Sequence, residues 1–477
     1  MRVGQTSFIV FISKLLGSVL GFLATLTFAR ILGADVIGYY SIALAVIAWL
    51  KLGGDLGVSQ AVSKRISEAD DPDEYYTAGL ITIGAFVVAI SLVVLILRDA
   101  IDSYIGVHVW HFVIPLAVTG LLITLATSTL NGERKVHISG LLTPVNLTIT
   151  SITQIALVLA GFKLTGMLFG YLVGEFLIGI TAIAIVSSSI RLPEKQHFKR
   201  LYDFAKYSWL GSLKLRSFND IDVLVLGALV SPSLVGVYTV AWSLSKFLTL
   251  FGGAVRSAMF PEVSHADASG DSDRIKNLTE DSLSFIGLIA IPGLFGGVIL
   301  GDRLLRIYGD EFTQGTTVLG ILILATLIYS YQQQMLGIIK GIDRPKIAFK
   351  INAVFIVLNF TLNVLLVLWI GWVGAALATA VSAFFAAVLA YRALKRLVEF
   401  DSPIREPAYQ VFAACVMAVV VYAARSTIEA STLPKYNAVL VVVLVGFGAT
   451  VYFTVLIGVS GQFRDLLSSN APITLPF

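Results

Sequence analysis

The chain has few of the residues with which a water-soluble domain covers its surface. Charged residues make up only 13% of its 477 residues, while apolar residues make up 57%. Soluble domains carry about 25% charged residues. A chain this apolar has no means of covering a surface that faces water. The composition therefore indicates an integral membrane protein. The net charge of +4 is no evidence for nucleic-acid binding, because no compact basic domain exists to carry such a site.

Reactive and metal-binding residues are also scarce. The single cysteine, Cys415, excludes an intramolecular disulfide. The five histidines lack the spacing of a metal site, and no G-x-x-x-x-G-K-[ST] loop is present for ATP. We therefore expect no metal, no cofactor and no catalytic residue, which argues against an enzyme. The histidines are His108, His111, His137, His197 and His265.

Long apolar runs dominate what is present. A helix needs about 20 apolar residues to cross the hydrocarbon of a bilayer. The sequence predicts an all-α integral membrane protein with about fourteen transmembrane helices, or twelve if the last pair packs at the periphery. The predicted spans are 6–29, 36–60, 76–98, 111–131, 138–160, 164–187, 207–229, 233–260, 281–300, 315–339, 348–369, 372–391, 408–425 and 437–459.

The distribution of Lys and Arg predicts the orientation of these spans. With the N-terminus inside, the inner segments hold 21 Lys and Arg residues and the outer segments hold 7. Cytoplasmic loops carry the excess of Lys and Arg in membrane proteins. The first apolar run contains Lys14 and no small-residue cleavage site, so no cleavable signal peptide is expected. The sequence predicts a multi-pass protein of a prokaryotic plasma membrane with both termini in the cytoplasm.

A repeated motif predicts an internal duplication. Leu32–Ala43 reads LGADVIGYYSIA, and Val235–Ala241 reads VGVYTVA, with Gly38 and Gly236 198 residues apart. Duplicated halves are common in transporters, whose binding site lies between the repeats. We expect two pseudo-symmetric six-helix lobes at 1–187 and 207–400, a cytoplasmic connector at 188–206, and two extra helices with the C-terminal tail at 401–477.

Cationic residues occur only in the spans that the duplication relates, namely the first, second, seventh and eighth. Ionisable groups in hydrocarbon cost at least ~2.5–3.5 kcal/mol each and usually face a cavity or one another. We expect these residues to line a basic cavity for an anionic head group such as phosphate or pyrophosphate. Arginine binds phosphate oxygens in a bidentate manner, whereas lysine acts as a point charge. The six candidates are Lys14, Lys51, Lys214, Arg216, Lys246 and Arg256.

Four acidic residues in the spans are candidates for ion coupling, and one arginine is a candidate outer gate. Asp220 lies four residues after Arg216, so the two can pair on one helical face. A buried Glu175 either carries a proton or accepts an interlobe hydrogen bond. The acidic candidates are Asp55, Glu175, Asp220 and Asp222, and the gate candidate is Arg30.

Plainer interpretations stay open for several of these residues. Lys51 and Asp55 have the spacing to neutralise each other. Lys14 is near enough to the inner surface to extend to it, and Arg256 is placed for an interfacial anchor as well as for a cavity. Arg30 is also placed to anchor the outer end of its span.

Several motifs resemble one transporter family. The segments Phe28–Ser41, Asp55–Gly57, Ala61–Lys64 and Gly252–Val263 resemble those of the Wzx-type O-antigen flippases, in the multidrug/oligosaccharidyl-lipid/polysaccharide exporter superfamily. The resemblance implies a V-shaped pair of six-helix lobes around a cationic cavity. It also implies that a polyprenyl-(pyro)phosphate-linked oligosaccharide is flipped from the inner to the outer leaflet by alternating access.

The same resemblance bears on individual residues. In related lipid II flippases, arginines on spans 1, 2 and 8 engage the pyrophosphate. Here Arg256 matches in kind, while Lys14 and Lys51 stand as lysine substitutes.

Other functions compete with this prediction. A lipid II flippase would use the same mechanism. A multidrug antiporter of the same superfamily favours an acidic cavity, against which the basic excess argues. A glycan polymerase or ligase needs a large outer loop or a catalytic acidic set, and neither is evident. The expected partners are the polyprenyl-phosphate-linked glycan, the bilayer, and glycan-assembly glycosyltransferases or a polymerase; the protein is expected to be a monomer that binds no nucleic acid.

Overall fold

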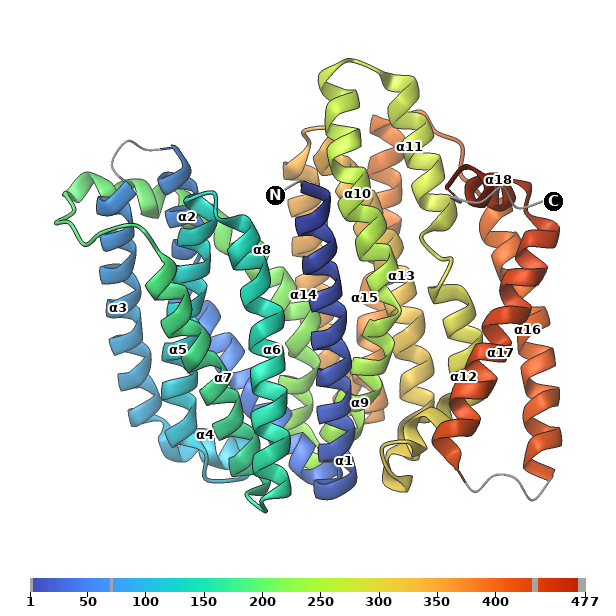
Figure 1. Cartoon of the computed structure of the whole chain (residues 1–477), viewed down its shortest axis with the longest axis horizontal. Coiled ribbons are helices and arrows are strands. Elements are labelled where there is room, and N and C mark those ends of the chain that lie inside the picture. The colour runs from blue at the N-terminus through green and yellow to red at the C-terminus, as the bar shows by residue number, and fades with distance from the viewer. Residues whose placement is uncertain (1–2, 69–71, 431–435, 471–477) are drawn as a thin grey trace. The chain divides into compact units, whose positions relative to one another are not determined.

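The computed structural model describes residues 3–68, 72–430 and 436–470 and shows helices throughout (Figure 1). Within those ranges no strand occurs. Eleven of the described helices are long and apolar enough to cross a membrane, or twelve if the bent pair α9 and α10 forms one span. A helix satisfies its own backbone hydrogen bonds, which a lipid-exposed segment requires. The predicted all-α membrane class is confirmed.

The exact count of fourteen spans is not confirmed. The first predicted span and most of the second, up to Asp55, lie in one helix, α1 (Val3–Asp55), which is interrupted at Gly33, where φ is 80° and ψ is 177°. The predicted span 207–229 lies in α8 (Lys195–Leu229). It carries four charged residues, Lys214, Arg216, Asp220 and Asp222, and is not among the eleven. These four charged residues drew attention to the span, and they also lower its hydrophobicity.

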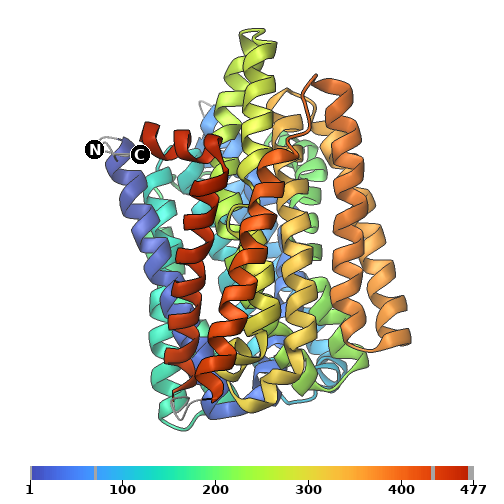
Figure 2. The same ribbon diagram turned by 90° about the vertical axis from the view of Figure 1, so that its right-hand side faces the viewer.

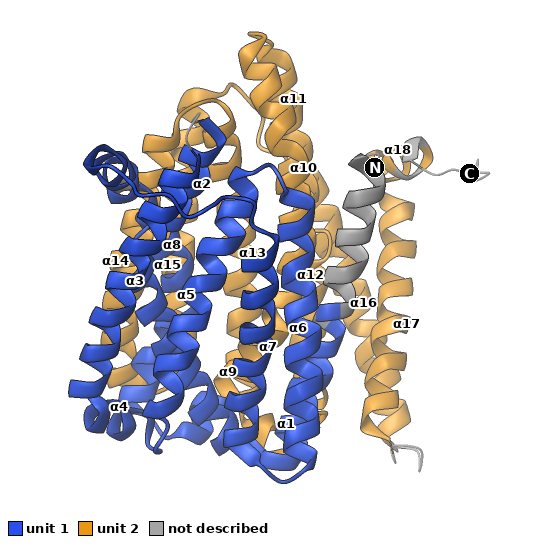
Figure 3. Cartoon of the chain, turned by 60° about the vertical axis from the view of Figure 1, so that its left-hand side comes forward, with its two compact units in different colours: residues 1–236 blue, residues 237–477 orange. Residues whose placement is uncertain are grey.

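The chain divides into two compact units, residues 1–236 and 237–477 (Figure 3). The first unit contains α1, α8 and six helices between them. The helix α9 (Pro232–Phe247) begins in the first unit and continues into the second. The intervening helices are α2 (Val58–Glu68), α3 (Pro72–Ile96), α4 (Arg98–Ile105), α5 (Trp110–Gly132), α6 (Val136–Leu159) and α7 (Lys163–Ile185).

Close helix packing organises the first unit. The helix α7 lies between α5 and α6, and α8 packs on α1, α2 and α3. A β-carbon on Gly174 would lie 1.9 Å from Thr150 Oγ1, and one on Gly170 would lie 2.7 Å from Gln154 Cγ. Glycines four residues apart allow helix backbones to approach closely where lipid removes the hydrophobic drive between helices. These two glycines therefore fix the spacing of α6 and α7.

The two copies of the repeated motif contact each other within the first unit. A β-carbon on Gly38 would lie 1.8 Å from the carbonyl oxygen of Pro232, and one on Gly236 would lie 2.0 Å from that of Ala34. Only glycine permits backbones to meet at this distance. Gly33 divides α1 into a first arm before it and a second arm after it. The second arm and the first turn of α9 are thereby held together.

The second unit holds the remainder of α9 and the helices that follow it. In it α13, α14 and α15 pack together, and α16 and α17 pack on each other and on α12 (Figure 2). Its elements are α10 (Thr249–Ala268), α11 (Ser272–Phe285), α12 (Ala290–Arg306), a 3-10 turn η1 (Asp310–Gly315), α13 (Thr316–Gly341), α14 (Pro345–Ile370), α15 (Val373–Leu397), α16 (Arg405–Ala430), α17 (Asn437–Val459) and α18 (Gly461–Asn470).

Charged side chains attach α16 to α12 at one end. Arg425 donates two hydrogen bonds of 2.8 Å to the carboxylate of Asp302, and Arg303 pairs with Glu429 at 2.8 Å. An apolar cluster that includes Leu300, Met417 and Leu444 fills the space between the helices. The final helix pair is therefore an integral part of the second unit.

Large apolar side chains cover much of the outer surface of the helices. Trp369 is 81% exposed, Ile96 79% and Val442 70%. Surfaces of this kind are stable against lipid chains rather than water. Together with the apolar helices, they make the chain a multi-pass membrane protein.

Candidate functional site

A charged pair lies inside the first unit. Lys51 of α1 places its ammonium nitrogen 2.8 Å from Oε1 of Glu175 on α7. The two side chains are only 17% and 5% exposed. An ion pair at this depth is stable only when the remaining polar atoms of both partners are also satisfied.

A hydroxyl group lies beside the second oxygen of Glu175. Thr119 of α5 can donate to Oε2 at 3.1 Å. The Thr119 hydroxyl also lies 2.8 Å from the carbonyl oxygen of Pro115, to which it can donate instead. Three helices thus converge on one carboxylate.

The backbone of α5 leaves a gap that the Lys51 ammonium fills. A β-carbon on Gly120 would lie 2.0 Å from Lys51 Nζ and 2.1 Å from its Cε. The ammonium therefore occupies a niche formed by Gly120, Thr119 and Glu175. We call these three residues the Lys51 niche.

Polar contacts extend from α1 to α6, and a charge on α8 lies within electrostatic reach. Tyr40 of α1 accepts a hydrogen bond from Gln154 at 2.8 Å, and Gln154 also donates to the carbonyl oxygen of Met167. Tyr40 and Tyr171 lie within electrostatic reach of Glu175, and Tyr171 lies within reach of Arg216. The polar interior of the first unit therefore involves α1, α5, α6, α7 and α8.

The structure does not pair Lys51 with Asp55, which was one of the interpretations left open. Lys51 pairs with Glu175, 124 residues away, rather than with Asp55. Asp55 ends α1 and accepts hydrogen bonds from the backbone N–H groups of Gly57 at 3.2 Å and Ser59 at 3.0 Å. A carboxylate at a helix start satisfies N–H groups that have no partner in the helix. The Asp55 side chain therefore caps α2.

The charged residues of α8 lie in the first unit too. The predicted pair of Arg216 and Asp220 is confirmed, with 3.3 Å between Nη1 and Oδ2. Arg216 is 38% exposed and Asp220 is 22% exposed. Lys214 and Asp222 on the same helix are buried, at 8% and 3%. Arg216 is therefore the most accessible of the α8 cations predicted to bind phosphate.

The cations of the second unit lie on α9 and α10. Lys246 is half-buried, with its ammonium 5.0 Å from the ring centre of Trp242. Arg256 is half-buried, and its aliphatic stem packs over Gly337 of α13, where a β-carbon would lie 3.2 Å from Arg256 Cγ. A cation over an indole is stabilised by the ring electrons.

The two remaining candidates lie on the first arm of α1. Arg30 is exposed. Lys14 falls outside the residues whose side chains the structure describes.

Sequence reasoning missed a group of buried amides in the second unit. Asn359 of α14 donates to Thr379 Oγ1 of α15 at 3.1 Å, and Asn363 donates to the carbonyl oxygen of Asn359. Asn359, Asn363 and, on α13, Gln332 are fully buried. Neither polar atom of the Gln332 side chain has a hydrogen-bond partner among the residues that the structure describes. The signal in the sequence was the i, i+4 spacing of Asn359 and Asn363 within an apolar run.

Buried amide oxygens are satisfied by a donor, a water molecule or a hard cation. Among the described residues no group of three or more His, Cys, Asp or Glu side chains could hold a metal ion.

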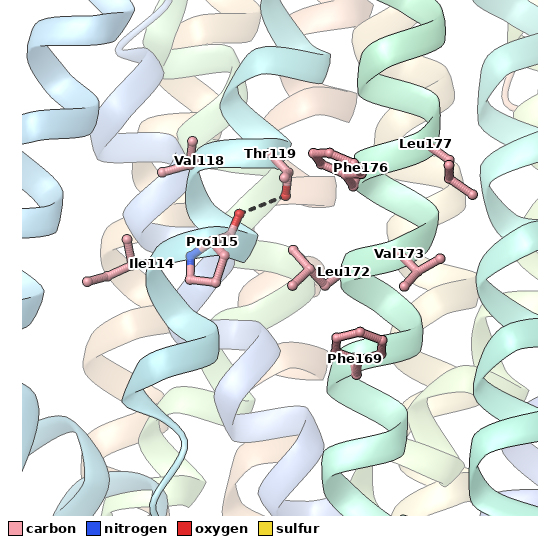
Figure 4. A pocket seen from close by; sticks show the side chains of 9 residues that line it. All are labelled: Ile114, Pro115, Val118, Thr119, Phe169, Leu172, Val173, Phe176 and Leu177. Carbon is pink, nitrogen blue, oxygen red and sulfur yellow. Dashed lines mark hydrogen bonds between the residues drawn. The ribbon is translucent and has the colours of Figure 1, made fainter.

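An apolar groove lies between α5 and α7, with Thr119 among its lining residues (Figure 4). Its volume is about 490 Å³. Phe169 and Phe176, 49% and 53% exposed, form part of its wall. The groove is lined by Ile114, Pro115, Val118, Thr119, Phe169, Leu172, Val173, Phe176 and Leu177.

The bundle of apolar helices has the fold of a solved membrane protein. The chain superposes on the inward-closed conformation of the lipid II flippase MurJ with a TM-score of 0.81, covering 96% of this chain and 100% of that one. The sequence identity is 15%, so the likeness concerns the fold.

The family is established by sequence. Residues 27–317 match the family described as polysaccharide biosynthesis protein, and the chain belongs to that family. Two relatives come from Haloferax volcanii: a "probable flippase AglR", 29% identical and covering 97% of both chains, and a "probable low-salt glycan biosynthesis flippase Agl15", 28% identical and covering 95% and 96%. The resemblance to polysaccharide exporters is confirmed.

Proposed function

We propose that this protein flips a polyprenyl-(pyro)phosphate-linked oligosaccharide from the inner to the outer leaflet by alternating access. Two relatives that span nearly the whole chain are named as flippases, one of them for glycan biosynthesis. The observation that carries the proposal is the polar interior of the first unit, where Lys51, Lys214 and Arg216 lie on helices that are otherwise apolar. Charges of this kind in a membrane protein mark a pathway for a charged substrate.

Each cation has a distinct role in this proposal. Arg216 is more exposed than Lys214, so it would meet the phosphate first and bind it through two N–H groups. Lys51 and the buried Lys214 then contribute point charges. In the second unit, Lys246 and Arg256 are the corresponding phosphate candidates. Lys14 remains a proposed ligand and Arg30 a proposed outer gate.

Four acidic residues complete the proposal. Asp220 neutralises Arg216 until substrate arrives, and Glu175 does the same for Lys51. Asp222, buried on α8, is the remaining candidate for ion coupling. Asp55 is also proposed for coupling, although its oxygens are engaged by backbone N–H groups.

Location and partners follow from the same function. We propose the plasma membrane of a prokaryote, with both termini in the cytoplasm as the positive-inside pattern predicts. The glycosyltransferases that assemble the glycan would act before the flippase, and a polymerase or transferase would consume its product outside. The flippase would act as a monomer. The work of flipping is binding and release, which requires no catalytic group.

Charge reversal on α8 tests the proposal. We expect Lys214→Glu and Arg216→Glu each to abolish glycan export in cells while the protein stays folded, because a carboxylate repels the phosphate. Lys199→Glu is the matched control, since Lys199 lies exposed on the same helix. Mass analysis of lipid-linked glycans should show accumulation in the first two strains and none in the control. Normal export in both α8 variants would count against phosphate binding there.

The identity of the accumulating lipid separates the remaining candidates. A glycan on a polyprenyl carrier supports the proposal. Accumulation of lipid II would instead assign a role in cell-wall synthesis, as in MurJ, whose fold the chain shares. Increased sensitivity to cationic drugs without lipid accumulation would assign a multidrug antiporter.

A further inference from the structure

The Lys51 ammonium is fully engaged in the structure. It is 2.8 Å from Glu175, and it fills the space that a side chain on Gly120 would need. A lysine held in this way has no free charge to offer a phosphate. If Lys51 binds substrate, as the proposed function requires, its side chain must first leave the Lys51 niche.

The niche is arranged so that Glu175 keeps a partner after Lys51 leaves. The Thr119 hydroxyl can donate to its Oε2. Removing one member of a buried ion pair is ordinarily strongly destabilising, because the other charge is left without compensation. The hydroxyl donor on α5 reduces this cost. The pair is therefore built to open.

The groups around the niche favour release of Lys51 when an anion is present. From α1 come Lys51 and Tyr40, from α5 Thr119, from α6 Gln154 through Tyr40, and from α7 Tyr171. Arg216 of α8 lies within electrostatic reach of Tyr171. A phosphate held by Arg216 would therefore approach the polar interior from the α8 side, where Lys51 could join it.

We propose that Glu175 is an internal competitor of the substrate phosphate: it holds Lys51 in the niche while the transporter is empty, and it takes Lys51 back when the phosphate leaves. This inference rests on the proposed function and adds an element that the function alone does not require. Glu175, Thr119 and Gly120 are then positioning residues, which act on the substrate through Lys51. The competition weakens binding, and it speeds release at the outer leaflet.

Two substitutions remove the competition in different ways. Glu175→Gln keeps the shape and can keep the hydrogen bond from Thr119, but it removes the charge that attracts Lys51. Gly120→Ala keeps Glu175 and instead places a β-carbon where the Lys51 ammonium lies. The obstructing atoms belong to the free end of a flexible side chain, so Lys51 can move aside without a change in the backbone. Both variants present Lys51 to the phosphate.

The test is binding of farnesyl pyrophosphate to the purified full-length protein in detergent, by calorimetry. We expect Glu175→Gln and Gly120→Ala each to bind on the order of tenfold more tightly than the wild type, since coupling between close charges commonly reaches that size. Gly84→Ala is the matched control for the glycine, because no atom lies within 4 Å of a β-carbon there. It should bind like the wild type.

A double-mutant cycle shows whether the effect passes through Lys51. If it does, Glu175→Gln has no effect on affinity in a Lys51→Met background, because the contested cation is gone. Equal tightening in both backgrounds would mean that Glu175 merely repels the anion, and the competition would be wrong. In transport into vesicles, Glu175→Gln should lower both the half-saturating concentration and the maximal rate.

The results separate this inference from the function on which it rests. Suppose that the wild type binds the probe, and that folded Glu175→Gln or Gly120→Ala binds it no more tightly than the wild type. That result overturns the competition and leaves the proposed function standing. A wild type that binds neither farnesyl pyrophosphate nor inorganic pyrophosphate overturns both. Size-exclusion profiles establish which variants are folded, and one folded variant suffices for the decision.

Discussion

The two units place polar groups inside the membrane in opposite ways. The first unit buries a charged pair, Lys51 and Glu175, with the Thr119 hydroxyl beside it. The second unit buries the neutral amides Asn359, Asn363 and Gln332, and among the described residues the side-chain oxygens of Asn359 and Gln332 have no donor. Charges in a low-dielectric interior respond strongly to another charge, whereas amides respond weakly.

The difference indicates a division of work. A paired charge can exchange its partner for an incoming anion, so the interior of the first unit is suited to sense a phosphate. The amide Asn359 instead joins α14 to α15, where a side-chain hydrogen bond adds to van der Waals packing. We expect mutations to the polar interior of the first unit to change both stability and binding, and those of the second to change stability slightly.

The largest expected effect comes from splitting the charged pair. Lys51→Met leaves the Glu175 carboxylate buried without its cation. Because the Thr119 hydroxyl can still donate to it, we expect a loss of stability near the lower end of the ordinary range of about 3–5 kcal/mol. The double variant Lys51→Met/Glu175→Gln should recover most of it, since no charge is then left alone. Thermal unfolding of the purified proteins in detergent measures both. Equal losses in the single and double variants would show that the pair is not coupled in this way.

A backbone contact gives the next largest effect. Gly38→Ala would place a β-carbon 1.8 Å from the Pro232 carbonyl, where neither helix can yield without a backbone shift. We expect a loss of about 1–3 kcal/mol. Gly253→Ala in the second unit meets no atom within 4 Å and should stabilise α10 by up to about 1 kcal/mol. Comparable destabilisation by Gly38→Ala and Gly253→Ala would mean that the close backbone contact at Gly38 does not account for the loss.

Two aspartates at helix ends contrast hydrogen bonds to the backbone with an ion pair. Asp102 of α4 accepts 2.9 Å hydrogen bonds from the N–H groups of Val109 and Trp110, and His108 lies 3.0 Å from its second oxygen. Burial opposes ionisation, but the hydrogen bonds from Val109, His108 and Trp110 outweigh it and lower the pKa of Asp102. Asp302 in the second unit binds the guanidinium of Arg425 instead.

The lowered pKa of Asp102 sets the sign of its pH dependence. A lowered folded-state pKa means that the stabilisation is complete above the unfolded value, about 3.9, and is lost as pH falls through the folded value. We expect Asp102→Asn to cost about 1–2 kcal/mol at pH 7 and progressively less below about pH 4.

Salt separates the two aspartates in the same experiment. Charge screening weakens an ion pair near the surface, so the cost of Asp302→Asn should fall in high salt while that of Asp102→Asn stays nearly constant. Unfolding curves at several pH values and salt concentrations measure both. The reverse order of salt sensitivity would contradict the assignment.

The smallest effects are expected from the amides. Asn359→Leu breaks the hydrogen bond to Thr379 and should cost about 1 kcal/mol. Gln332→Met removes two polar atoms that have no partner and should be neutral or slightly stabilising. The unfolding temperatures of Asn359→Leu and Gln332→Met test these two expectations. A loss of transport in Gln332→Met with unchanged stability would instead reveal a bound water or ion that the amide serves.

Much of this protein could be read from short-range patterns. Apolar runs of span length predicted the helical membrane class, and the i, i+4 spacing predicted the pair of Arg216 and Asp220. The partner of Lys51 could not be read in this way, because Glu175 is 124 residues distant and only the packing of α1, α5 and α7 brings them together. Asp55 had the right spacing for Lys51, yet the end of α1 directs its carboxylate to α2.

The sequence by itself determined that the chain lies in a membrane and that its spans are helices. Both follow from local composition, because exposing apolar groups to water and backbone polar groups to lipid is costly. Its motifs also determined the family. Tertiary structure alone decided which charges meet: a lysine and a glutamate on distant helices form a pair because a glycine on a third helix leaves room for the ammonium. Electrostatic energy depends on distance in space, and in a folded chain that distance is unrelated to separation along the sequence.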